Sequence, residues 1–175
     1  MAVKANALLL ATLCSTATTL VACAEPESWT ILVDAPIGIV TSQCSRPPPP
    51  GTFGVWNPTA SDVARAESQL PELLRTMIGR VPEHHRRGVP QSYIRQYMGI
   101  VRNGERLLYI NGLARELMTP AYVDFYDDTW RHKSVGICDG GIDAFGAVFS
   151  LSGDRFQWFS FNDLPGERYE MDTQP

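Results

Sequence analysis

The chain has 175 residues, a formal net charge of −4 and 44% hydrophobic residues, the balance of a folded globular protein. Its mild acidity argues against nucleic acid as a partner, because nucleic-acid binding requires a basic surface stripe. After removal of the N-terminal segment described next, about 150 residues remain, which is enough for one domain with its own core.

Residues 1–24 have the layout of an export signal. Lys4 supplies a short positive region, the run from Ala5 to Val21 is apolar or small and uncharged, and polar sequence begins at Glu25. Loss of this segment removes Lys4 and changes the net charge from −4 to −5. The sequence therefore predicts a protein that leaves the cytoplasm.

The end of this segment contains two overlapping processing sites. Leu20-Val21-Ala22-Cys23 resembles a bacterial lipobox, in which Cys23 is acylated and becomes the mature N-terminus. Ala22-Cys23-Ala24 fits ordinary cleavage before Glu25, and an uncleaved anchor is a third alternative, because about 17 apolar residues are at the short end of a membrane span. We favour a lipoprotein anchored through Cys23 to the outer membrane, on the periplasmic side of the envelope.

The four cysteines divide into two pairs. Cys14 and Cys23 belong to the export segment, which leaves Cys44 and Cys138 in the folded domain. Two cysteines in an oxidising compartment most often pair, so we predict a Cys44–Cys138 disulfide that closes a loop of about 95 residues and contributes up to roughly 4–5 kcal/mol. The alternative is a reactive Cys138 thiolate with His132 as its base.

The segment before the domain, residues 25–55, is predicted to be extended. It contains a β-branched stretch, Trp29–Val40, which indicates a short strand that Pro36 confines to a sheet edge or splits. Four prolines follow at 47–50, and consecutive prolines favour polyproline II, so we expect a stiff spacer. The domain is predicted to occupy residues 56–175, with a loose tail from Leu164.

One helix is predicted at the N-terminal end of the domain. Thr59 is a suitable N-cap, and Asp62 completes a partial capping box. Pro71 removes a backbone donor and crowds the preceding turn, so we expect a kink or two abutting helices there, and Gly79 is the expected stop. The apolar positions at helical spacing are Val63, Ala66, Leu70, Leu73, Leu74, Met77 and Ile78.

The remainder is predicted to be antiparallel sheet. Asn103-Gly104, the strongest short hairpin signal, separates the first two strands, and an irregular loop with one helical turn follows. The expected strands are Tyr93–Val101, Arg106–Leu113, Ser134–Cys138, Ala144–Leu151 and Arg155–Asn162, and the loop is Arg115–Lys133. One helix on a sheet of about four to five strands is an α+β fold, and its element order loosely resembles cystatin-like proteins.

No catalytic residue, cofactor or metal site is predicted. The run His84-His85-Arg86-Arg87 is interpreted as a solvated loop, because adjacent histidines do not readily share a metal. Two acidic groups, Asp139 with Asp143 and the aspartates at 124, 127 and 128, lack the spacing of a calcium-binding loop. We interpret both groups as turn and surface acids.

The segment 156–161 carries aromatic side chains on both faces of a predicted strand. With period-two alternation, Phe156 and Trp158 point opposite to Phe159 and Phe161. A second apolar face left in water is unfavourable, so we predict that the Trp158 face is covered by the loop Tyr122–Trp130 or docks a partner. The candidate binding-surface residues are Trp158, Phe156 and Trp130.

Several short motifs resemble a family of uncharacterised exported lipoproteins of proteobacteria. They lie within Val55–Asn162 and are Trp56-Asn57-Pro58-Thr59, Arg95-Gln96-Tyr97-Met98-Gly99, Tyr109-Ile110-Asn111, Cys138-Asp139-Gly140-Gly141 and Phe145-Gly146. The resemblance implies an exported bacterial protein and supplies no activity.

Three functions remain open on the sequence. We favour a noncatalytic cell-envelope protein that binds a protein or a small ligand through its sheet. A periplasmic inhibitor or immunity protein against a hydrolase is an alternative, suggested by small size, acidity, export and the loosely cystatin-like order. The third is a cysteine-dependent enzyme that uses Cys138.

Overall fold

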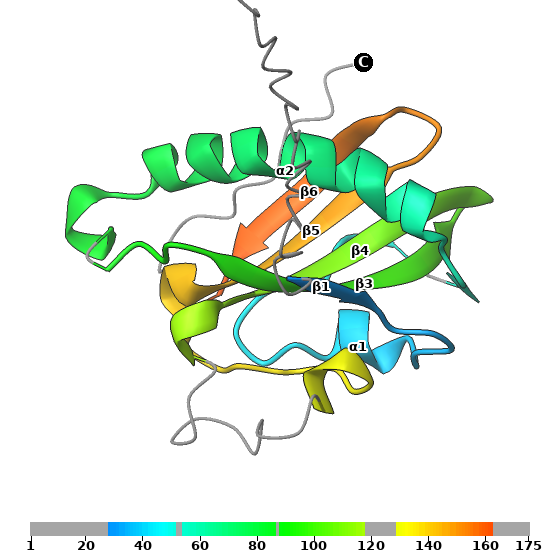
Figure 1. Cartoon of the computed structure of the whole chain (residues 1–175), viewed down its shortest axis with the longest axis horizontal. Helices are drawn as coiled ribbons and strands as arrows, with labels where there is room; N and C mark the ends of the chain where they lie inside the picture. The colour runs from blue at the N-terminus through cyan, green and yellow to red at the C-terminus, as the bar shows by residue number, and fades with distance from the viewer. Residues whose placement is uncertain (1–27, 52–53, 87, 118–128, 163–175) are drawn as a thin grey trace, which may run out of the picture.

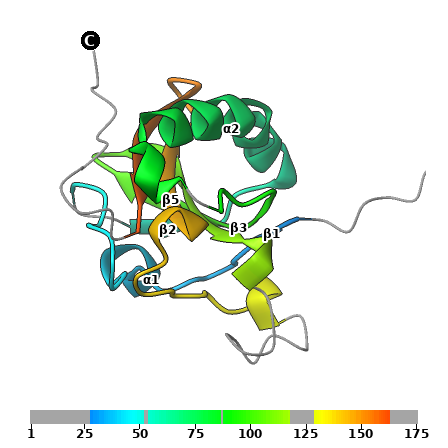
Figure 2. The same cartoon turned by 90° about the vertical axis from the view of Figure 1, so that its left-hand side faces the viewer.

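The structure is a computed structural model, and it describes residues 28–51, 54–86, 88–117 and 129–162. One long helix lies on one face of a six-stranded sheet, and irregular segments lie on the other (Figure 1, Figure 2). The elements are β1 (Trp29–Ile31), α1 (Gly38–Thr41), β2 (Gly54–Trp56), α2 (Ala60–Arg80), η1 (Glu83–His85), β3 (Tyr93–Arg102), β4 (Glu105–Ala114), η2 (Arg115–Leu117), η3 (Thr129–Arg131), η4 (Gly141–Asp143), β5 (Ala144–Ser150) and β6 (Arg155–Phe161). The predicted α+β class is confirmed.

The position of the long helix corrects the prediction. We expected it at the N-terminal end of the domain, but β1, α1 and β2 precede α2, which lies mid-chain. Only the start of the predicted strand Trp29–Val40 is extended, since Gly38–Thr41 forms α1. Proline 36 lies between the two elements, where its missing N–H interrupts neither.

The strand order is β1-β3-β4-β5-β6, and β2 also pairs with β3. β1 is parallel to β3 at Arg95–Tyr97, whereas β2 is antiparallel to it at Gly99–Val101, so the two short strands lie one after the other along one edge. The other pairs are antiparallel. Asn103 and Gly104 turn β3 into β4 with φ of 52° and 81°, the left-handed conformation that an Asn-Gly hairpin requires.

Helix α2 covers what we call the first face of the sheet. It begins at the expected capping box: the backbone N–H of Thr59 donates to Asp62 Oδ2 at 2.8 Å, and the Asp62 N–H donates to Thr59 Oγ1 at 3.3 Å. It continues through Pro71 as one helix, so the predicted alternative of two abutting helices is wrong. Its buried side chains pack on an aromatic layer of the sheet that includes Tyr97, Phe145, Phe149, Phe156, Phe159 and Phe161.

Two irregular segments cover the opposite, second face. The N-terminal cover, residues 28–51, places Leu32, Ala35 and Val40 against the sheet, and includes β1 and α1. The loop cover, residues 129–143, places Trp130 and Val135 against it. Figure 2 shows α2 on one side of the sheet and these segments on the other. Both faces of the central strands are therefore buried.

The N-terminal cover includes part of the predicted proline spacer. Pro49 is buried, and the carbonyl of Pro50 accepts a hydrogen bond from Arg102 Nη1 at 3.2 Å. Pro49 and the Pro50 carbonyl thus contact the domain, whereas Pro47 and Pro48 are exposed. The predicted tail from Leu164 and the residues 118–128 lie outside the described ranges.

Two sequence predictions about strands are wrong. Ser134–Cys138 is not a strand but an irregular part of the loop cover. Phe156 and Trp158 do not share a face, because the pairing of β5 with β6 shifts between Val148 and Phe149. Val148 pairs with Trp158 and Phe149 with Phe156, so Gln157 is the extra residue of a β-bulge, which the alternation rule does not anticipate.

Candidate functional site

A row of polar and small residues crosses the second face in register. Gln96 of β3 pairs with Asn111 of β4, Asn111 with Gly146 of β5, and Gly146 with Ser160 of β6. We call these four residues the polar row. Apolar rows flank it on both sides: Met98, Tyr109, Val148 and Trp158 toward the N-terminal cover, and Ile94, Leu113 and Ala144 toward the loop cover. The row therefore lies beneath the boundary between the two covers.

The amide side chains of the second face bind the backbone of the loop cover. Gln96 Nε2 donates to the carbonyls of Trp130 at 2.5 Å and Lys133 at 2.7 Å, and Asn111 Nδ2 donates to that of Val135 at 2.8 Å. Buried backbone carbonyls need donors, and this segment has no neighbouring strand to supply them among the described residues. Side-chain amides thus replace the strand pairing that we had predicted for Ser134–Cys138.

Arg46 reaches the polar row from the N-terminal cover and is 5% exposed. Its Nη1 donates to Asn162 Oδ1 at 2.9 Å, and its Nη2 donates to Tyr109 Oη at 2.9 Å and to Asn111 Oδ1. Its Nε lies over Gly146, where an added Cβ would come within 2.8 Å of it. The absence of a side chain at Gly146 therefore makes room for the guanidinium.

The Arg46 guanidinium is a buried positive charge whose hydrogen-bond partners are two amide oxygens and a phenol oxygen. Burying a charge without an opposite charge is unfavourable by several kcal/mol, although oxygen dipoles recover part of that loss. The ion pairs between described residues, Arg65–Asp154, Arg75–Glu72 and Arg95–Glu67, do not include Arg46. Apolar residues at all positions of this row would cost less free energy of burial than the polar residues that occupy it.

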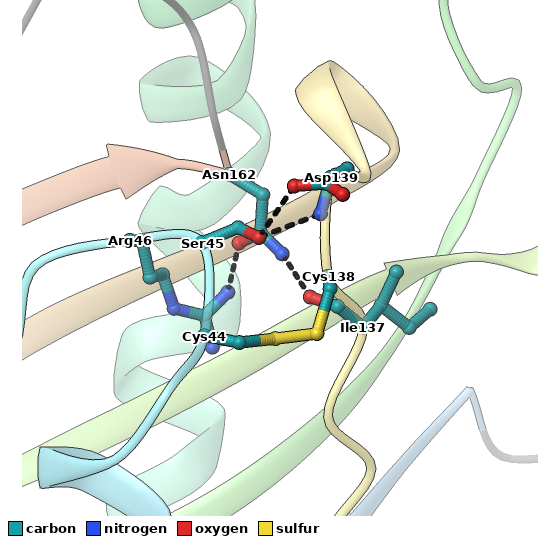
Figure 3. The surroundings of a disulfide bond; sticks show 7 residues. All are labelled: Cys44, Ser45, Arg46, Ile137, Cys138, Asp139 and Asn162. Carbon is teal, nitrogen blue, oxygen red and sulfur yellow. Dashed lines mark hydrogen bonds between the residues drawn. A yellow bond between two sulfur atoms is a disulfide. The ribbon is translucent and has the colours of Figure 1, made fainter.

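The predicted disulfide between Cys44 and Cys138 is confirmed, with a Cα–Cα distance of 5.4 Å. It joins the N-terminal cover to the loop cover beside Arg46 (Figure 3). Ser45 Oγ donates to Asp139 Oδ1 at 3.1 Å and accepts from the Asp139 N–H at 2.6 Å, and Asn162 Nδ2 donates to the Ile137 carbonyl at 2.6 Å. In this state the sulfur of Cys138 is bonded and is not a thiolate nucleophile.

The candidate binding-surface residues are buried and separated. Trp158 is 4% exposed and packs under the N-terminal cover, Phe156 lies in the core beneath α2, and Trp130 belongs to the cluster of the loop cover. The N-terminal cover therefore lies over Trp158, and Trp130 packs elsewhere. Residues 122–128 of the predicted covering loop lie outside the described ranges, so that prediction stays a prediction. Cys23 lies outside the described residues.

A second, partly buried polar group links α2 to β3. Glu67 accepts hydrogen bonds from Arg95 Nε at 2.8 Å, from Arg95 Nη2 at 2.6 Å and from Tyr97 Oη. Burial, followed by the charge of Glu67, raises the pKa of Tyr97 well above its ordinary value. Every group has a partner, so this arrangement fixes the helix on the sheet. Sequence patterns did not indicate this group, because Glu67 and Arg95 come together only in the folded structure.

The remaining candidates stay apart from the polar row. The rings of His84 and His85 lie 4.1 Å apart in a 3-10 turn after α2. Burial, followed by the charge of Glu116, raises the pKa of Asp143. In the described ranges no group of three His, Cys, Asp or Glu residues is placed to hold a metal ion. The aspartates at 124, 127 and 128 lie outside those ranges.

Comparison with known proteins gives no match to a family model, a curated protein or a solved structure. Among the described helices, none is long and apolar enough to cross a membrane. The functional argument therefore rests on the residues of the second face.

Proposed function

We propose that this chain is an exported, noncatalytic protein of the bacterial cell envelope that binds a protein or a small ligand through the second face of its sheet. The polar row with Arg46 is the observation that carries the binding part of the proposal. The lipobox at Cys23 and the Cys44–Cys138 pair support the proposed location outside the cytoplasm.

The cysteine pair supports export. Disulfides persist in oxidising compartments and are rare in the cytosol, and the Cys44–Cys138 bridge joins two segments that cover one sheet face. The lipobox adds a route to the membrane. An acyl chain contributes about 0.8 kcal/mol per buried methylene, so more than one chain on Cys23 gives stable attachment.

The composition of the second face supports binding. Local rules of core packing favour apolar residues across both faces of a buried sheet, and sequences depart from them mainly at functional or strained sites. Here Gln96, Asn111 and Arg46 occupy buried positions between two apolar rows. Their amide and guanidinium donors are bonded to the loop cover and to Asn162, Tyr109 and Asn111. Once released from these partners, they suit a ligand or a peptide that carries carbonyl or carboxylate oxygens.

Fractionation tests the location. We expect the wild type in the outer-membrane fraction and Cys23→Ser in the soluble periplasm, with acylated Cys23 as the mature N-terminus. A soluble wild type that begins at Glu25 contradicts the lipid anchor but leaves export intact. Retention in the cytoplasm contradicts both.

Affinity capture from envelope extract, with mass spectrometry of the bound material, tests the binding site. Arg46→Gln removes the charge at the polar row, and Arg65→Gln is the matched control, since Arg65 pairs with Asp154 away from it. We expect Arg46→Gln to lose a partner that the wild type and Arg65→Gln retain, with all three proteins folded by circular dichroism. Equal capture by all three contradicts the proposed site.

A further inference from the structure

The disulfide is the covalent link between the two covers of the second face. Cys44 follows α1 in the N-terminal cover, which packs on the apolar row that contains Trp158. Cys138 lies in the loop cover, which packs on the apolar row that contains Ile94. The polar row runs beneath their boundary. Whatever controls this bond therefore controls whether the two covers can separate over the row.

The bridge is accessible from solvent. Both Cys44 and Cys138 are exposed residues, although they join segments that bury their apolar side chains. Thiol–disulfide exchange requires a thiolate to reach one of the two sulfurs, and exposed bridges are the ones that exchange most readily. Figure 3 shows the two cysteines where the chain of the N-terminal cover passes that of the loop cover.

Beyond the bridge, side-chain hydrogen bonds join the N-terminal cover to its surroundings near Cys44. Ser45 contacts Asp139, and Arg46 contacts Asn162, Asn111 and Tyr109. Burial of the guanidinium is unfavourable by itself, because water solvates a cation better than these oxygens do. The bond at Cys44, two residues before Arg46, holds the backbone in the position that keeps Arg46 buried.

The far end of the N-terminal cover is attached independently. β1 pairs with β3 from Trp29 to Ile31, and the Leu32 N–H donates to the Tyr97 carbonyl at 2.8 Å. The loop cover is likewise held by Gln96 and Asn111. Between these ends, residues 33–51 are also held by exposed hydrogen bonds of Asp34 with Asn57 and of the Pro50 carbonyl with Arg102, and by the packing of Ala35 and Val40. Loss of the bridge leaves only noncovalent contacts of this kind on residues 33–51, while β1 stays paired.

We propose that the Cys44–Cys138 bond is a redox-sensitive latch that closes the N-terminal cover over the polar row. A thiolate of a dithiol reductant attacks one bridge sulfur, the Cys44–Cys138 bond breaks, and a mixed disulfide forms. The second thiol of the reductant then releases the protein. Two electrons pass to the protein, its cysteines take up two protons to become thiols, and the reductant becomes a disulfide.

Opening of the latch exposes Gly146, Asn111, Tyr109 and Trp158 and returns Arg46 to water. The latch thus gives the proposed binding face a closed, oxidised state and an open, reduced state. Its use as a gate for a partner rests on the proposed function, whereas the opening itself does not.

Hydrogen exchange measured by mass spectrometry tests the latch. The mature protein is compared before and after treatment with dithiothreitol without denaturant, together with Cys44→Ser/Cys138→Ser in the absence of reductant. We expect the bond to be reduced in the folded protein and residues 33–51 to exchange at least tenfold faster, with α2, β3 and β4 unchanged. The double variant should match the reduced wild type.

Three outcomes overturn the proposal. They are a bond that resists reduction until the protein is denatured, equal exchange of residues 33–51 in both states, and joint loss of protection in all strands, which marks a global stabilising bridge. If the latch opens but capture by oxidised and reduced protein is the same, the latch stands and the proposed binding face fails. If a partner is captured but the N-terminal cover does not open on reduction, the proposed binding face stands and the latch fails.

Discussion

The two faces of the sheet are built in different ways. On the first face one helix packs an apolar stripe on an aromatic layer, with Glu67, Arg95 and Tyr97 as a polar link at its side. On the second face two irregular segments meet over the polar row, and amides, an arginine and a disulfide hold them. The first face is thus held mainly by apolar packing, whereas the second combines apolar packing with specific polar contacts and one covalent bond.

This difference has a physical basis in the covers themselves. A helix satisfies its own backbone hydrogen bonds, so it needs only apolar contacts from the sheet. An irregular segment does not, so the sheet beneath it must supply donors and acceptors. Gln96 and Asn111 meet that requirement for the loop cover. A face that must supply polar groups is also a face that can offer them to a ligand.

The largest effect is expected from a cavity under α2. Phe159 is fully buried, stacks on Phe145 with ring centroids 5.3 Å apart and contacts Phe161 edge-on. Phe159→Ala removes the ring from a packed layer that cannot collapse, so we expect a loss of about 3–5 kcal/mol in the free energy of unfolding. Denaturant titration measures it. A loss below about 1 kcal/mol would show that the first face is not the main core.

A smaller effect is expected from overpacking the second face. At Gly146 an added Cβ lies 2.8 Å from Arg46 Nε and 3.0 Å from a ring carbon of Trp158. Gly146→Ala must therefore displace a buried charge, and overpacking of this kind destabilises by about 1–3 kcal/mol. Gly136→Ala is the matched control, because its Cβ meets nothing within 4 Å. Equal unfolding free energies for the two variants would contradict the described position of Arg46.

The helix cap ranks next. Thr59 accepts from the Asp62 N–H and also donates its hydroxyl to Asp62 Oδ2 at 2.6 Å. Thr59→Ala removes the capping box, and we expect a loss of about 1 kcal/mol by thermal or chemical unfolding. Thr76→Ala, an exposed threonine in the same helix, should change stability by less. The reverse order would mean that α2 does not begin at Thr59.

Sequence patterns predicted the first face well. The capping residues, the helical stripe and the Asn-Gly turn are local signals, and each lies where it was expected. The cysteine pair was also predictable, since only two cysteines remain outside the export segment. The cap, the stripe and the turn are each specified by residues a few positions apart. For the disulfide, two remaining cysteines allow only one pairing.

The second face was predicted poorly because its signals are distant in sequence. Arg46 is 116 residues from Asn162 and 65 from Asn111, and nothing in the run before the prolines marks it as buried. The bulge at Gln157 reverses the alternation that assigned Phe156 to the face of Trp158. The in-register order of Gln96, Asn111, Gly146 and Ser160 becomes visible only after the strands are paired.

The smallest expected effect is a pH dependence that separates the two ends of the sheet. The hydrogen bond from Ser150, with others from Ser152 and Gln157, lowers the pKa of Glu105 in the folded protein. A lowered pKa means that Glu105 stabilises the fold above its unfolded pKa and loses this contribution as the pH falls through the folded value. The pKa of Asp143 is raised by burial, so Asp143 contributes most at low pH and becomes unfavourable as the pH rises through its folded value.

Unfolding of Glu105→Gln and Asp143→Asn at about pH 7 and about pH 3 measures both signs. We expect Glu105→Gln to lose stability at the higher pH and little at the lower, whereas Asp143→Asn should be more favourable, relative to wild type, at the higher pH than at the lower. Both carboxyls remain in contact with solvent, which screens their interactions and keeps the changes below those of the core variants. The same pH dependence in both variants would contradict the opposite environments of the two groups.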